Sequence, residues 1–143
     1  MAVIYLIGSL RNPIIPEIAN KIEKATGHEV FDDWFAAGPI ADDSWQAYET
    51  HRGTSYDKAL QGYAAQHVYK FDLHHLHRAD IGLLVLPAGK SGHLEFGWMI
   101  GKGKPGYILF DKEPERWDVM NNFATKVFFS LDDLIKELKN EIS

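Results

Sequence analysis

The stretch from Ile81 to Glu95, IGLLVLPAGKSGHLE, decides the fold. Its first six residues, Ile81 to Leu86, form an apolar run without alternation, which is typical of a strand buried on both faces of a parallel sheet. A proline and small residues follow from Pro87 to Gly92 and predict a short loop. From His93 to Gly101 the sequence predicts a helix. A strand, a short loop and a helix in this order form the repeating unit of α/β folds.

The same alternation continues on both sides of this stretch. Ala2 to Ile7 predict a second buried strand that stops at Gly8, and residues 12 to 26 predict a helix that ends at Gly27. The other predicted elements are strands at His28–Phe31, Tyr107–Phe110 and Val127–Phe129, a mostly helical segment at 42–79 and a helix at Leu131–Ile142, with Asn12, Asp42 or Asp43, and Ser130 as helix caps. We therefore predict an α/β fold, an open and mostly parallel sheet with helices on both faces, built by a single domain over residues 1–143.

Composition excludes several classes of function. The chain has 143 residues, 45% hydrophobic and 24% charged, with no cysteine, so disulfides, thiolate metal sites and a cysteine nucleophile are excluded. The net charge is −5, and Lys102 and Lys104 form a pair rather than a basic patch, which argues against polymeric nucleic acid but not against a single nucleotide. The chain opens directly into its first predicted strand and has no long apolar run. We expect a cytoplasmic protein with no membrane partner.

Ligands of open parallel sheets bind beyond the carboxyl ends of the strands. That rule selects three segments: Gly8 to Asn12, Asp32 to Trp45, and Pro87 to Glu95. Glu95 follows the central strand and lies early in a predicted helix, whose N-terminus favours an ionised carboxylate. Such a carboxylate can attack an anomeric carbon, as in retaining glycosidases. The alternative is a surface glutamate in an early helical turn, which is the better interpretation of this position by itself.

Two loops at this predicted edge can bind an anion. Gly89, Lys90, Ser91 and Gly92 offer backbone N–H groups, a hydroxyl and a positive charge to a phosphate or a sugar hydroxyl. The loop matches neither the GxGxxG nor the GxxxxGK[ST] pattern, so neither a dinucleotide nor a Walker-type site is supported. An ordinary strand-to-helix turn explains it equally well.

The second loop begins at Gly8. Its Ser9 and Arg11 can form a phosphate clamp, and the alternative is a helix cap with a surface arginine.

Other side chains are candidates for chemistry or binding. Tyr5 lies within the first strand and reaches Glu95 if that strand neighbours the Ile81 strand; otherwise it is a core tyrosine. Asp72 can act as the acid that protonates a leaving base. The aromatic loop can stack on a planar base or form a small satellite core; it contains Asp33, Trp34, Phe35, Trp45 and Tyr48. His74, His75 and His77 point to different helical faces, so we expect no metal site.

Three stretches together resemble one known family. They are IYLIGS at residues 4–9, the DxxxL and AD pattern from Asp72 to Asp80, and above all LVLPAGKSGHLEFGWMIGKGKP from Leu84 to Pro105. Their order and spacing are similar to the nucleoside 2-deoxyribosyltransferase superfamily, including its nucleoside 5′-monophosphate N-glycosidase branch. The resemblance covers most of the chain and is weakest from Lys112 onward.

The resemblance implies a compact flavodoxin-like fold that assembles into a homodimer or a higher homo-oligomer. It implies Glu95 as the nucleophile that attacks C1′, Tyr5 as the residue that orients it, and Asp72 as the group that handles the proton of the departing base. The sugar would be held by Gly89 to Gly92. A neighbouring subunit would complete the site; Met120, Asn121 and Asn122 are its candidates. The partners would be a nucleoside or nucleotide and a nucleobase, without a cofactor.

Two departures from the family pattern bear on the substrate. An aspartate that contacts the sugar in the transferase branch is replaced here by Gly89, six residues before Glu95. The start Gly8-Ser9-Leu10-Arg11 instead resembles the GSxR of the monophosphate N-glycosidases and favours a phosphorylated substrate. We expect transfer of a 2-deoxyribosyl group to another nucleobase. The alternatives are transfer to water by a monophosphate N-glycosidase, and a non-catalytic nucleotide sensor.

Overall fold

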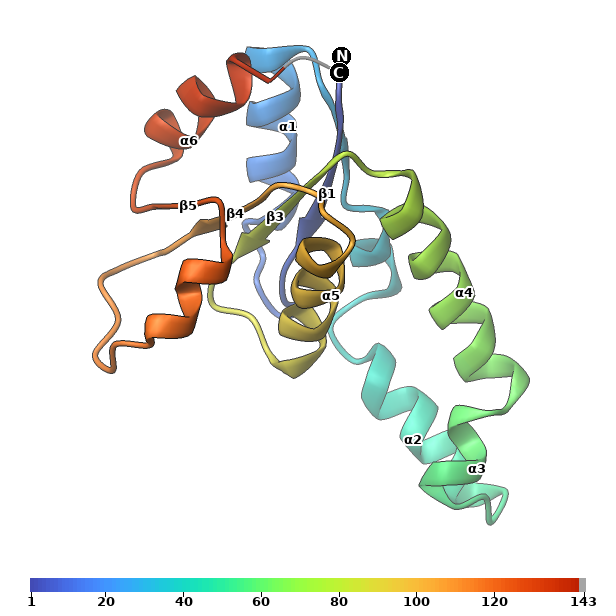
Figure 1. The fold of residues 1–143 in the computed structure, drawn as a ribbon. Helices are drawn as coiled ribbons and strands as arrows, with labels where there is room; N and C mark the ends of the chain where they lie inside the picture. Colours follow the sequence, from blue (N-terminus) through green and yellow to red (C-terminus); the bar gives the residue numbers. More distant parts are fainter. Residues whose placement is uncertain (142–143) are drawn as a thin grey trace.

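A computed structural model of the chain describes residues 1–141. Its centre is a five-stranded sheet in the order β2-β1-β3-β4-β5, and every neighbouring pair of strands is parallel (Figure 1). The strands are β1 (Val3–Ile7), β2 (Glu29–Phe31), β3 (Ile81–Val85), β4 (Gly106–Leu109) and β5 (Lys126–Phe128). This is the flavodoxin-like order of doubly wound sheets, so the predicted fold class is confirmed.

Helices cover both faces of the sheet. They are α1 (Ile15–Thr26), α2 (Ala41–His51), α3 (Tyr56–Leu60), α4 (Tyr63–Arg78), α5 (Lys90–Gly101) and α6 (Leu131–Lys139), with short 3-10 helices η1 (Asp33–Ala37) and η2 (Val119–Phe123). One face packs against α1 and α6, and the other packs against α5 and the end of α4. Helices α2 and α3 and the beginning of α4 project away from the sheet as an arm (Figure 1).

Alternation along β1 assigns each side chain to one of two cores. Ile4 and Leu6 face α1 and α6, whereas Tyr5 and Ile7 face α4 and α5. All four are at most 1% exposed, because a central parallel strand is buried on both faces. Tyr5 lies opposite Gly82 of β3 in the parallel register, so β1 and β3 are neighbours. This was the condition under which Tyr5 was predicted to reach the helix that follows β3.

The positions where the helices begin differ from the predictions. Helix α1 begins at Ile15, and Asn12 does not cap it, because its side chain is used one turn earlier, where Oδ1 accepts from the Ile14 N–H at 3.3 Å. Helix α2 begins after Ile40 without a side-chain cap, so neither Asp42 nor Asp43 has that role. The predicted cap Ser130 is confirmed, because its hydroxyl accepts from the Asp133 N–H.

Two further boundaries matter for the site. Helix α5 begins at Lys90, three residues earlier than predicted, so half of the predicted loop is the first turn of the helix. The segment predicted as mostly helical contains three helices, interrupted by a turn with Gly53 at φ 76° and by Gly62. The predicted last residue of the final helix, Ile142, lies outside the described residues. None of the helices in residues 1–141 combines the length and apolar character that a membrane crossing requires.

Candidate active site

Tyr5 and Glu95 meet on the face of the sheet that α4 and α5 cover. The Tyr5 hydroxyl donates a hydrogen bond to Glu95 Oε2 at 3.3 Å, and its ring is buried to 1% exposure. Tyr5 comes from the central strand β1, and Glu95 comes from the second turn of α5, where it is half-buried. The strand therefore supplies a fixed donor, and the helix holds the carboxylate above it.

Asp72 contributes the third polar group from a third element. It is half-buried on α4, and its negative charge raises the pKa of both Tyr5 and Glu95, so it lies near both. Burial raises the pKa of Asp72 itself to about 6. A tyrosine and two carboxyl groups from β1, α4 and α5 thus gather in one partly desolvated place.

The environment makes Glu95 a weaker acid than an ordinary glutamate. Burial is the main cause and Asp72 the second; together they raise the pKa of Glu95 to about 7, although the hydrogen bond from Tyr5 opposes them. The sequence predicted that the helix N-terminus favours the ionised form of Glu95, and burial and Asp72 outweigh that contribution here. Because α5 begins at Lys90, Glu95 lies beyond the first turn, where the effect of the helix dipole fades. Near neutral pH this carboxyl group can both release and accept a proton.

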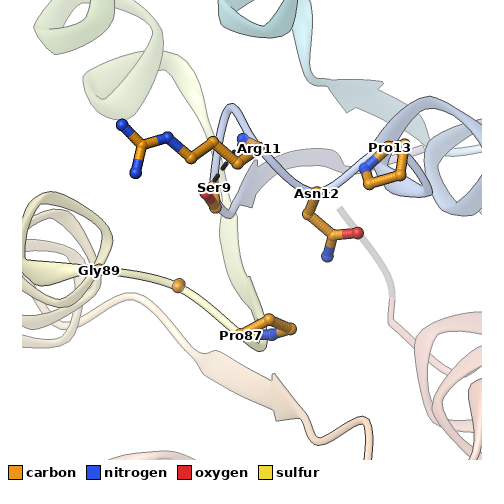
Figure 2. A pocket seen from close by; sticks show the side chains of 7 residues that line it. Ser9, Arg11, Asn12, Pro13, Pro87 and Gly89 are labelled. Carbon is orange, nitrogen blue, oxygen red and sulfur yellow. Dashed lines mark hydrogen bonds between the residues drawn. The ribbon is translucent and has the colours of Figure 1, made fainter. Parts of the chain in front are cut away.

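A hollow of about 340 Å³ opens where β1 and β3 end (Figure 2). Predicted binding residues line it from both strands: Ser9 and Arg11 follow β1, and Gly89 follows β3. The Ser9 hydroxyl accepts from the Arg11 N–H at 3.0 Å and fixes the turn. The Arg11 guanidinium lies 3.7 Å from Asp43 with both side chains exposed, which is a weak pairing that a ligand can replace. Ser9 and Arg11, predicted to form a phosphate clamp, thus both line this hollow.

Asn12 also lines this hollow; it ends the predicted ligand segment Gly8 to Asn12, although the role predicted for its side chain was a helix cap. It is 8% exposed, and its Oδ1 is occupied by the Ile14 N–H, which fixes the orientation of the amide. Its Nδ2 has no hydrogen-bond partner among residues 1–141. Its position directly after Arg11 in the loop beyond β1 was the available signal.

The other glycines and polar residues of the two loops have different places. A side chain at Gly8 would lie 2.6 Å from Ile15 Cδ1, and one at Gly92 would lie 3.1 Å from Ile7 Cγ2, so packing accounts for both glycines. Lys90 and Ser91 are exposed in the first turn of α5. These residues flank the hollow without lining it, in contrast to Gly89.

The aromatic loop is divided between anchoring and exposure. The Trp34 indole N–H donates to the Leu6 carbonyl at 2.8 Å, which ties η1 to β1, and its ring packs against both cores. Asp33 is exposed beside it. Trp45 faces Tyr56 of α3, and Tyr48 is exposed on α2, so both belong to the projecting arm. The loop therefore does not act as one stacking platform.

Two of the three histidines near the end of α4 pack against aromatic side chains of other elements. His75 stacks on Phe31 at 3.9 Å between ring centroids, and His77 meets the Trp98 ring edge-on at 4.8 Å. Within residues 1–141, no group of three or more histidine, aspartate or glutamate side chains is arranged to hold a metal ion.

A second hollow, of about 410 Å³, lies between α5 and η2. Met120 and Asn121 line it, whereas Asn122 bonds within η2, donating from Nδ2 to the Val119 carbonyl at 3.0 Å. Tyr5, Asp72 and Glu95 do not line this hollow. Within one copy of the chain, the structure therefore does not bring these η2 residues to Glu95.

Comparison with solved structures finds the same fold in proteins of low sequence identity. The 2-deoxyribosyltransferase of Bacillus psychrosaccharolyticus superposes with a TM-score of 0.63 at 20% identity, over 99% of this chain and 93% of that one. A conserved protein from Enterococcus faecalis V583 superposes with a TM-score of 0.66 at 15% identity, over 99% of each chain. The CMP N-glycosidase BcmB of Clostridium botulinum gives a TM-score of 0.53 at 12% identity, over 95% of this chain and 97% of that one.

These likenesses extend over nearly the whole chain and show a shared fold. No protein-family model matches the sequence, and no curated protein matches it.

Proposed function

We propose that this protein cleaves the N-glycosidic bond of a nucleoside or of its 5′-monophosphate, with Glu95 as the nucleophile. The observation that carries the proposal is the hydrogen bond from the Tyr5 hydroxyl to Glu95 Oε2, with Asp72 close to both. A pair of carboxyl groups with an orienting donor is the equipment of retaining glycoside chemistry. Two proteins that share the fold are named as a 2-deoxyribosyltransferase and a CMP N-glycosidase, which supports this class of reaction.

The proposed reaction has two steps. One Glu95 oxygen attacks C1′ of the sugar while the bond from C1′ to the base nitrogen breaks, and the electron pair of that bond leaves with the base. Asp72, whose pKa is raised to about 6, donates a proton to the departing base. The sugar is then held as an ester of Glu95. In the second step an acceptor attacks C1′ and loses its proton to Asp72, which frees the Glu95 carboxylate.

Tyr5 keeps Glu95 in place through both steps. Its hydroxyl holds one carboxylate oxygen and leaves the other free to attack, and it favours the ionised form of Glu95. The pKa of Tyr5 is itself raised, mainly by burial, so it stays a hydrogen-bond donor throughout the working range of pH.

The hollow beyond β1 and β3 is the proposed site of the 5′-phosphate. Ser9, Arg11 and Gly89 line it, and Gly89 is the N-cap of α5, whose free N–H groups favour an anion. Glu95 lies in the second turn of the same helix and does not line the hollow, so a substrate with its phosphate there must reach out of the hollow to place C1′ at the carboxylate.

Transfer to a second nucleobase is the first form of the proposal, and transfer to water is the second. The test is to incubate the protein with deoxynucleosides and their monophosphates, with and without an acceptor base. Base exchange that requires the acceptor identifies a transferase, and free base released without one identifies an N-glycosidase. Binding of these compounds without either reaction would identify a nucleotide sensor and overturn the proposal.

A homo-oligomer completes the proposal. Apolar side chains are exposed on and beside η2, where Trp117 is 82% exposed and Phe123 is 69% exposed, and patches of this kind mark association surfaces. A second copy that covers η2 would bring Met120, Asn121 or Asn122 to its neighbour's site. Sedimentation of the wild type and of Phe123→Glu tests this: the proposal expects a dimer or larger assembly that the substitution dissociates, and a wild-type monomer would contradict it.

A further inference from the structure

Lys104 joins the two helices that carry the carboxyl groups. Its ammonium group donates to the backbone carbonyls of Leu76 at 2.9 Å, of His77 at 2.7 Å and of Ala79 at 2.5 Å. All three carbonyls lie at the C-terminal end of α4, where a helix leaves its last carbonyl groups without partners. A lysine ammonium has three donors, and all three are used here.

The backbone of Lys104 is fixed to α5. After α5 ends, Gly103 adopts φ 81°, and the Lys104 N–H donates back to the Met99 carbonyl at 3.1 Å. This turn directs the Lys104 side chain toward α4. Its ammonium also lies 5.9 Å from the centre of the Trp98 ring, and that ring meets His77 of α4. One side chain thus connects the last turn of α5 with the last turn of α4.

The connection is close to Asp72 and Glu95. Asp72 lies one helical turn before Leu76, which is the one residue of α4 that is buried in the core. Trp98 lies three residues after Glu95. The beginning of α4 belongs to the projecting arm, and the core cluster contains Leu76 and Ala79 at the C-terminal end of the helix (Figure 1). Whatever fixes this end also fixes how closely Asp72 approaches Glu95.

We propose that Lys104 is a positioning residue, which clamps the end of α4 to α5 and so sets the separation of Asp72 and Glu95. The proposal rests on the function proposed above for these two groups. Small displacements of catalytic groups reduce turnover strongly, and a clamp beyond the substrate would affect turnover more than binding. Two charged side chains, Asp80 and Lys102, lie near Lys104. The three hydrogen bonds to the α4 carbonyls nevertheless all come from the Lys104 ammonium group.

The test compares Lys104→Met with Lys102→Met. Lys102 is a matched control because its ammonium lies over the same Trp98 ring, at 5.4 Å, but it is not among the donors to the α4 carbonyls within the described part of the chain. For Lys104→Met we expect kcat to fall about tenfold or more with KM changed less than about threefold. Lys102→Met should behave as the wild type. Equal kinetics in the two variants would overturn the proposal.

A second readout does not depend on turnover. If α4 moves away from α5, Glu95 becomes less buried and lies farther from the charge of Asp72. The pKa of Glu95 should therefore fall below about 7 in Lys104→Met and stay unchanged in Lys102→Met. Carbon NMR of the labelled carboxyl group measures this pKa. An unchanged pKa overturns the positioning role even if kcat falls. If Lys104→Met does not fold, Lys104→Gln, which loses the charge and cannot keep all three bonds to the α4 carbonyls, must shift the pKa of Glu95 in the same direction. If the wild type has no activity but Lys104→Met still lowers the pKa of Glu95, the proposed function is rejected and the positioning role of Lys104 is retained.

Discussion

Asp72 and Glu95 stand on different helices, α4 and α5, and the charge of Asp72 raises the pKa of Glu95. The two groups need opposite protonation states in the proposed first step: Glu95 must be ionised, and Asp72 must carry a proton. The pKa is about 7 for Glu95 and about 6 for Asp72. Above about pH 7, therefore, Glu95 is ionised but Asp72 has mostly lost its proton, and below about pH 6 Asp72 is protonated but Glu95 is mostly neutral.

The first prediction is a bell-shaped dependence of kcat/KM on pH. The active form needs Glu95 ionised and Asp72 protonated, so the rate should fall below about pH 6 and above about pH 7, with a maximum at about pH 6.5. Initial rates of base release from pH 5 to pH 9 measure the profile. A rate that keeps rising to pH 9 would contradict the role of Asp72 as the acid.

The second prediction concerns the cost of burying Glu95. Its folded-state pKa lies above the ordinary value, so its favourable contribution to stability is complete below about pH 4.5 and is lost as the pH rises through about 7. Glu95→Gln should therefore abolish activity and stabilise the fold at pH 8 by about 2 kcal/mol, with little effect at pH 4.5. Urea unfolding at both pH values measures this difference.

Glu17→Gln is the matched control for that experiment, because Glu17 is an exposed glutamate paired with Lys21 on α1. It should change stability by less than about 0.5 kcal/mol at either pH. A Glu95→Gln protein that is less stable than the wild type at pH 8 would mean that the charged carboxylate is favoured by its surroundings.

The third prediction concerns the hydroxyl of Tyr5. Tyr5→Phe removes the hydrogen bond that favours ionised Glu95, so the pKa of Glu95 should rise further above the pKa of Asp72. The bell-shaped profile should then widen, because its basic limb moves to higher pH while its acid limb stays at about pH 6. We expect kcat to fall roughly tenfold to a hundredfold, as for loss of one orienting hydrogen bond. Tyr107→Phe changes a tyrosine on the opposite face of the sheet and should leave the basic limb where it is. An identical basic limb in Tyr5→Phe and wild type would refute the orienting role.

The fourth prediction separates the phosphate site from the reacting centre. Arg11→Ala should raise KM for a deoxynucleoside 5′-monophosphate about tenfold or more, because a charge-assisted contact is lost, and should leave KM for the unphosphorylated nucleoside unchanged. Arg116→Ala, in the loop after β4, is the control. An equal effect of Arg11→Ala on both substrates would place the phosphate elsewhere.

The fifth prediction tests the packing that holds α5 against β4. A side chain at Gly106 would lie 2.6 Å from Ile100 Cδ1 and 2.8 Å from Phe96 Cε1, so Gly106→Ala should destabilise the fold by about 2 kcal/mol. Gly97 of α5 has open space around it, so Gly97→Ala should stabilise the helix by up to about 1 kcal/mol. Thermal unfolding of the two variants under one set of conditions checks both signs.

The sequence predicted the fold because its signals are local. Unbroken apolar runs mark the central strands, and Gly27 ends α1 in the left-handed conformation that glycine favours. The errors lie at the helix starts, where a side chain can serve either a cap or the preceding turn. Asn12 bonds the Ile14 N–H in such a turn, and α5 takes in Lys90 to Gly92 because nothing in these residues prevents helix formation.

The site was predictable where it follows from strand order and not where it depends on packing between distant surfaces. Once β1 and β3 are neighbours, Tyr5 and the helix after β3 must be close, and the hydrogen bond to Glu95 follows. The raised pKa of Glu95 depends on burial, which no local pattern reports. The Lys104 contacts depend on where the end of α4 comes to rest against α5, so the sequence showed only a lysine after a helix.

The most direct test of the central claim is to trap the covalent intermediate. The wild type is mixed with a deoxynucleoside or its monophosphate without an acceptor base, quenched in acid within the first turnover, digested and examined by mass spectrometry. We predict one added deoxyribosyl group from the nucleoside, or one 5-phosphodeoxyribosyl group from the monophosphate, on the peptide that contains Glu95, and neither in Glu95→Gln. Release of base with no sugar on Glu95, or with the sugar on another residue, would contradict the account.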